Sequence, residues 1–97
     1  MTYSEIISSQ PVVLVEFFAT WCPHCQKMMP VVAQVKSKLS GRAEVVQLDI
    51  DENRQAADEA KADTIPTFIL YRDGKEIWRQ SGEISQEALL AKVESAL

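Results

Sequence analysis

The chain has 97 residues, of which 46% are hydrophobic, and a formal net charge of −4. This length and composition predict one small globular domain over residues 1–97. The acidic balance argues against binding to nucleic acid or to anionic membranes, which both use clustered Lys and Arg, and no apolar run is long enough to cross a bilayer.

The first two predicted elements are a short helix and a strand. Thr2 and Glu5 have the spacing of a capping box, which predicts a helix that begins near residue 3 and ends at Pro11. The near-continuous apolar run 12–19 predicts a strand that is buried on both faces.

A long helix is predicted to begin near Cys22 and to reach about Leu39, because apolar residues recur along it at helical spacing. Pro30 should kink this helix, and Gly41 should end it. The segment 43–51 that follows predicts the next strand.

The second half of the chain predicts a helix, a β-hairpin and a final helix. Asp51 is a candidate N-cap for a polar helix over residues 52–61. Residues 67–80 predict a hairpin, because Asp73 and Gly74 form a strong turn signal between two strand-like runs. The final helix is expected to turn four residues inward: Leu89, Leu90, Val93 and Leu97.

These elements predict an α/β fold. Two strands joined through a helix make a parallel pair, and the hairpin adds antiparallel strands, so the sheet is mixed and has helices on both faces. Cys22 follows the carboxyl end of the first strand, which is where α/β proteins place their functional sites.

Both cysteines and the only histidine lie in the segment WCPHC, Trp21–Cys25. The first ten residues contain no basic residue, so we expect no secretory signal and a cytoplasmic location, where a cysteine pair is more often catalytic or metal-binding than structural. A zinc site needs four ligands, which this chain supplies only if two copies share a site. Haem attachment needs His after the second Cys, where Gln26 stands. We therefore expect no metal site.

A redox role fits the spacing better. Residues i and i+3 in the first turn of a helix lie about 5–6 Å apart at Cα, which a disulfide can bridge. Pro23 suits the first helical position. Cys22 would then present a thiolate to solvent at the positive end of the helix dipole, while Cys25 lies shielded one turn inside. Two inert buried thiols are the competing interpretation.

His24 has two interpretations. It is either a solvent-facing residue at a helix start, or its imidazole stabilises the Cys22 thiolate. In the second case, His24 and Pro23 tune the redox pair, and the disulfide becomes more oxidising.

Four segments carry a resemblance to a known family: VVLVEFFATWCPHCQKMMP, DIDEN, TIPTFILYRDGK and SGEIS. In order and spacing they resemble the thioredoxins over nearly the whole chain. The resemblance implies a thioredoxin fold and a protein-disulfide reductase, with Cys22 as nucleophile and Cys25 as resolving cysteine. It implies no cofactor. Its expected partners are protein disulfides and an electron donor similar to thioredoxin reductase.

The resemblance also assigns residues around the cysteines. Trp21 matches the tryptophan that flanks the active site, and Pro30 matches the proline that kinks the active-site helix. Ile65 and Pro66 match a cis-proline loop that binds the substrate backbone. Gly82 matches a glycine that lines the same groove.

Glu16 matches the buried acid beneath the resolving cysteine, where thioredoxins usually have Asp. The implied role is proton acceptor for Cys25. Burial raises the pKa of a carboxyl group, and Gln47 stands where the family usually has a lysine, so no countercharge opposes this effect. The competing interpretation is that the longer Glu16 side chain reaches the edge of the sheet.

The chain departs from the family in two further ways. The first family strand is missing, so we expect four strands with residues 44–50 at an edge, and a monomer that can pair weakly through that edge. Pro23 and His24 replace the usual Gly-Pro, as in disulfide-forming oxidases of the same fold. A disulfide donor or isomerase is therefore an alternative function. A glutaredoxin-type enzyme and a non-enzymatic binding module that uses the apolar surface of Trp21, Ile65 and Pro66 are weaker alternatives.

Overall fold

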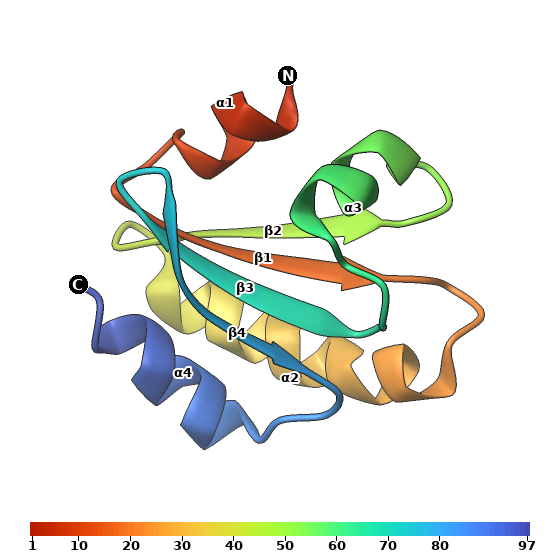
Figure 1. Ribbon diagram of the computed structural model, residues 1–97. Helices are drawn as coiled ribbons and strands as arrows, with labels where there is room; N and C mark the ends of the chain where they lie inside the picture. Colours follow the sequence, from red (N-terminus) through yellow and green to blue (C-terminus); the bar gives the residue numbers. More distant parts are fainter.

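The computed structural model describes all of residues 1–97, and its centre is a four-stranded sheet in the order β2-β1-β3-β4 (Figure 1). β1 pairs with β2 in parallel and with β3 antiparallel, and β3 pairs with β4 antiparallel. The predicted mixed sheet with the second strand at an edge is therefore confirmed. The strands are β1 (Val12–Phe18), β2 (Glu44–Asp49), β3 (Thr67–Arg72) and β4 (Lys75–Ser81).

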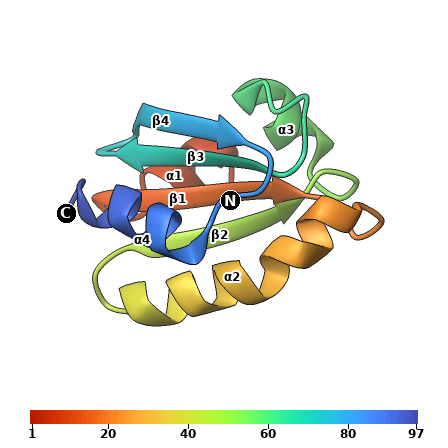
Figure 2. The same ribbon diagram turned by 90° about the horizontal axis from the view of Figure 1, so that it is seen from below.

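Helices cover both faces of the sheet, as predicted. Figure 1 shows α1 and α3 on one face and α2 and α4 on the other, and Figure 2 shows the second pair from below. None of the four combines the length and the apolar character that a membrane-spanning helix needs. The helices are α1 (Tyr3–Ile7), α2 (Pro23–Leu39), α3 (Arg54–Ala60) and α4 (Gln86–Glu94).

Alternation along β1 divides the core into two layers. Val12 and Leu14 pack with buried residues of α2 and α4, whereas Val13, Val15 and Phe17 pack with buried residues of α1 and α3. Each strand residue points to the face opposite its neighbour's. Position 16 of β1 therefore faces α2, the helix that carries one of the cysteines.

The first helix begins as predicted but ends early. Thr2 and Glu5 form both bonds of the capping box. The helix stops at Ile7 and does not reach Pro11, because the Ser9 hydroxyl and N–H both donate to the Ile6 carbonyl and close a turn.

The prediction that Asp51 caps α3 is wrong. The N–H groups of Glu52 and Asn53 donate to the Asp49 carbonyl, so a turn occupies these positions and α3 begins only at Arg54. Asn53 is the N-cap residue, and the Asp51 side chain is used elsewhere.

The hairpin is confirmed, but one inward residue of the last helix is not. Asp73 and Gly74 have φ of 52° and 79°, the pair of positive values that a tight hairpin turn of the I′ type requires. The α4 helix ends at Glu94, so Leu97 lies beyond it and is 49% exposed, while Ala96 is buried in the core.

Replacing Leu14 tests the layered core. Leu14 is fully buried, so Leu14→Ala should lower the free energy of unfolding by about 3 kcal/mol. The control is Met29→Ala on α2, where the residue is 55% exposed and the expected change stays within about 0.5 kcal/mol. Urea unfolding measures both, and equal changes would contradict the assignment of the core.

Candidate active site

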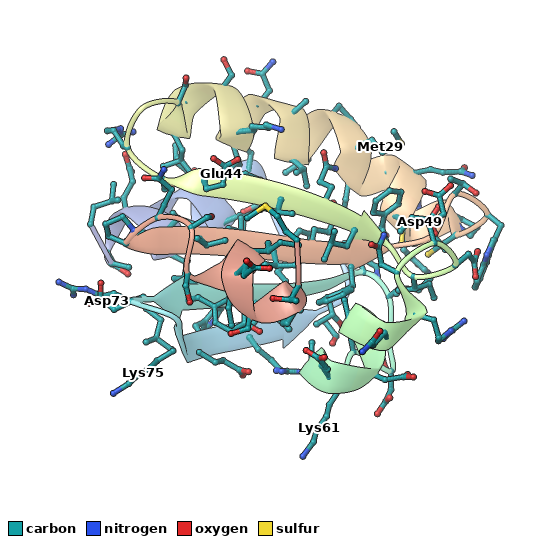
Figure 3. The ribbon with its side chains drawn as sticks, turned by 90° about the horizontal axis from the view of Figure 1, so that it is seen from above. Met29, Glu44, Asp49, Lys61, Asp73 and Lys75 are labelled. Atoms are coloured by element: carbon teal, nitrogen blue, oxygen red, sulfur yellow. The ribbon has the colours of Figure 1, made fainter.

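The candidate site lies where the parallel strands β1 and β2 end and α2 begins (Figure 1). The Ile50 N–H donates to the Phe18 carbonyl at 2.9 Å and joins the segments that leave the two strands. Figure 3 labels Asp49 at this end of β2 and Glu44 at the opposite end. The sheet thus places the functional side chains at one end of the molecule.

The Cys22 sulfur caps the helix that carries the second cysteine. Cys22 is the N-cap residue of α2, and its Sγ accepts a hydrogen bond from the Cys25 N–H at 3.3 Å. Pro23 occupies the first helical position, where its missing N–H leaves no bond unmade. N–H groups and the positive end of the helix dipole favour negative charge at this atom.

The Cys22 sulfur is more enclosed than predicted. The residue is only 5% exposed, compared with 1% for Cys25, because both pack in a small cluster with Ala19. The Cys22 Sγ also lies 3.9 Å from the Ile65 carbonyl oxygen. Cys22 is therefore largely covered by its neighbours.

Cys25 is a buried thiol. Burial, together with its hydrogen bond to Cys22, raises its pKa well above that of a free thiol, and the charge of Glu16 acts in the same direction. Both cysteines are free thiols in this structure. A protonated Cys25 can attack a disulfide only after it loses its proton, so a nearby proton acceptor is needed.

Glu16 is a buried carboxyl group whose charge acts on Cys25. The residue is 2% exposed and lies on the β1 face that turns toward α2, so its side chain does not reach the edge of the sheet. Burial raises its pKa to about 7, although the Gln47 Nε2 donates to its Oε1 at 3.0 Å and opposes this shift. The predicted burial and raised pKa are both found.

Two further loops meet beside Cys22. The Ile65–Pro66 peptide bond is cis, as the resemblance predicts. Pro66 is buried and Ile65 is half-buried. Gly82, which has a φ of 90°, donates its N–H to the Pro66 carbonyl at 2.8 Å. The structure therefore brings the residues assigned to a groove together.

Trp21 is 63% exposed beside Cys22, and a hydrogen bond holds its ring in place. Its Nε1–H donates to Asp51 Oδ2 at 2.8 Å. Because Asp51 follows β2, the bond crosses the end of the sheet. This role of Asp51 was missed in the sequence, where the residue resembles a helix cap.

His24 projects from the first turn of α2 and meets a residue that the sequence did not single out. Its Nδ1 lies 2.6 Å from Glu83 Oε2, and the two side chains are 66% and 42% exposed. The hydrogen bond from His24 holds the pKa of Glu83 below its usual range. No motif links residues 59 positions apart, so only the fold reveals this pair.

Comparisons with known proteins agree with this geometry. The thioredoxin family model matches residues 1–95. Thioredoxin Y, a chloroplastic protein of Oryza sativa, is 35% identical over 97 residues, which is 99% of this chain. A mutant thioredoxin from Halobacterium salinarum superposes with a TM-score of 0.87 at 32% identity, covering 96% of this chain and 80% of that one.

Some relatives are longer than this chain. The chain spans 58% of the Oryza sativa protein and 54% of thioredoxin Y1 of Arabidopsis thaliana. A bifunctional thioredoxin reductase/thioredoxin of Mycobacterium leprae is 36% identical over 88 residues, which is 91% of this chain and 19% of that protein.

The ionisation of Glu16 should appear in the pH dependence of stability. Its pKa is raised to about 7 in the folded chain, above the value near 4.5 of the unfolded chain, so the folded state holds the proton more tightly. The contribution of Glu16 to the free energy of unfolding is fully present below the pKa of the unfolded chain and is lost as pH rises to about 7. The free energy of unfolding falls by roughly 3 kcal/mol as a result.

Glu16→Gln removes this contribution and keeps the shape of the side chain. We expect the free energy of unfolding of the wild type, relative to this variant, to fall between pH 5 and pH 7.5 in urea titrations. All other groups titrate in both proteins and cancel in the difference. Two parallel pH profiles would show that Glu16 is not a buried acid with a raised pKa.

Proposed function

Because this chain belongs to the thioredoxin family of thiol–disulfide oxidoreductases, we propose that it reduces disulfide bonds in other proteins through Cys22 and Cys25. The observation that carries the proposal is the position of the Cys22 sulfur, which caps the helix that holds Cys25 one turn behind it. This arrangement places the two sulfurs within reach of each other, with Cys22 at the start of the helix and Cys25 one turn inside it.

The first step is attack by Cys22. Its thiolate forms a bond to one sulfur of the substrate disulfide, and the other substrate sulfur leaves as a thiolate. The Cys25 N–H and the helix dipole favour the negative charge that this nucleophile carries before attack. The product is a mixed disulfide between Cys22 and the substrate.

The second step is resolution by Cys25. Glu16 accepts the Cys25 proton, the Cys25 sulfur bonds to the Cys22 sulfur, and the second substrate sulfur leaves. Two electrons have then passed to the substrate, and the chain holds a Cys22–Cys25 disulfide. The buried carboxyl, whose pKa of about 7 leaves it partly ionised at neutral pH, supports this role.

The groove residues would hold the substrate during both steps. Trp21 offers an exposed apolar ring beside Cys22, and Ile65 offers a half-buried side chain. We assign the cis peptide before Pro66 and the loop at Gly82 to the same groove. The Gly82 N–H donates to the Pro66 carbonyl, and the neighbouring Ile65 carbonyl lies beside the Cys22 sulfur.

The proposed partners are protein disulfides and an electron donor similar to thioredoxin reductase. The donor returns two electrons and two protons to the oxidised pair. A relative in which a reductase and a thioredoxin share one chain supports this pairing. The monomeric state and the cytoplasmic location expected from the sequence stay predictions.

A disulfide donor or isomerase is the second candidate. It is favoured by one observation, the exposed His24 that follows Pro23 between the cysteines. The equilibrium constant of the cysteine pair against glutathione separates the two candidates, because a strongly reducing pair cannot donate its disulfide.

Substitution of each cysteine tests the proposed exchange. Cys22→Ser should abolish the reduction of insulin disulfides, because no nucleophile remains. Cys25→Ser should instead accumulate a mixed disulfide at Cys22, which non-reducing electrophoresis detects. Retained turnover in the first variant, or no covalent adduct in the second, would contradict the assigned roles.

Glu16→Gln should slow the resolution step by about 100-fold, which is a usual contribution of a general base. In the wild type, this rate should rise with pH through about 7 as the carboxyl ionises, and the variant should lack that inflection. Stopped-flow measurement of product release from a preformed mixed disulfide reports the rate. An equal rate in both proteins, with the same pH profile, would remove Glu16 from the mechanism.

A further inference from the structure

The loop after β4 reaches the residue that stands between the two cysteines. Glu83 Oε2 lies 2.6 Å from His24 Nδ1, although the residues are 59 positions apart in the chain. The contact is the only hydrogen bond of the imidazole, so it sets the direction in which the ring points. His24 immediately follows the first helical residue of α2, beside the capping sulfur.

Two hydrogen bonds of the residues just before Glu83 hold this loop in place. The Ser81 and Thr67 hydroxyl oxygens lie 2.8 Å apart, and the Gly82 N–H donates to the Pro66 carbonyl at 2.8 Å. The main chain just before Glu83 is therefore attached to the loop that contacts Cys22. The hydrogen bond to His24 then defines the position of the Glu83 carboxylate.

Glu83 places a negative charge beside His24 and near Lys27 of α2. His24 donates to its carboxylate, and Lys27, one turn further along the helix, also acts on it. The hydrogen bond from His24, and to a smaller extent the charge of Lys27, hold the pKa of Glu83 below its usual range, so the group is anionic at neutral pH. The fixed charge is thus paired with the imidazole that the sequence presents as a candidate redox tuner.

We propose that Glu83 is a positioning residue that keeps the Cys22–Cys25 pair reducing. A cation beside a thiolate stabilises the dithiol form and makes the disulfide more oxidising. Glu83 holds the His24 ring through their hydrogen bond and adds a negative charge beside it, and this charge opposes the stabilisation of a Cys22 thiolate. The inference rests on the proposed function and specifies how its direction of electron flow is set.

The effect of Glu83 on the cysteine pair can be measured as the equilibrium constant of its exchange with glutathione. The dithiol and one oxidised glutathione give the intramolecular disulfide and two reduced glutathiones, with two electrons passing to glutathione. A thiolate at Cys22 occurs only on the dithiol side. Any charge that acts on the Cys22 sulfur therefore shifts this equilibrium constant.

Glu83→Gln keeps the shape and an acceptor oxygen but removes the charge. We expect the equilibrium to move about threefold toward the dithiol, which is the size of effect that a partly exposed ion pair supports. The shift should shrink in a His24→Gln background, since Glu83 acts through the imidazole. It should also shrink at high salt, where charge interactions are screened.

The matched control is Glu44→Gln, which changes the net charge equally at the far end of β2 (Figure 3). It should leave the equilibrium where the wild type has it. The inference is overturned if Glu83→Gln gives no shift or the opposite shift, if the shift is equally large without His24, or if Glu44→Gln reproduces it. These readings do not depend on whether insulin is a substrate. Failure of the proposed function would instead appear as turnover in Cys22→Ser.

Discussion

The hydrogen bond from the Cys25 N–H to the Cys22 sulfur is the interaction on which the site depends. Helix N-caps usually use an oxygen, which satisfies one of the N–H groups that the first turn leaves free. Here a sulfur does so, and it gains a partial positive charge beside it. The same bond fixes the distance between the two cysteines, because both belong to one helical turn. Capping and the close approach of the two cysteines therefore come from a single local structure, which is also the proposed source of the activation of Cys22.

The sheet buries the carboxyl group of Glu16. Pairing places Glu16 of β1 opposite Gln47 of β2 and Phe68 of β3, so the carboxyl enters an apolar layer with one neutral amide as its donor. Burial without a countercharge raises the pKa of this carboxyl to about 7, so the group is partly protonated at neutral pH. The buried layer that stabilises the fold is therefore also the cause of this raised pKa.

Local patterns predicted much of this structure. The apolar run of β1, the capping box of α1, the Asp73-Gly74 turn and the cysteine spacing each express a short-range preference, and each is found as expected. Contacts between distant segments were not accessible in the same way. Asp51 resembles a helix cap in sequence but bonds to Trp21, and nothing local connects Glu83 with His24. The enclosure of Cys22 by the Ile65 carbonyl likewise depends on two loops that meet only in the folded chain.

The most direct test of this account is the alkylation rate of each cysteine in the reduced protein, followed by peptide mass spectrometry at neutral pH. If the helix start activates the Cys22 sulfur, iodoacetamide should modify Cys22 before Cys25. Iodoacetamide is a small reagent, chosen because access to Cys22 is limited. Its reaction with Cys22 should be about tenfold faster than its reaction with the thiol of an unstructured peptide. Modification of Cys25 first, or a rate at Cys22 equal to that of the peptide, would contradict the central claim that the helix start activates this sulfur.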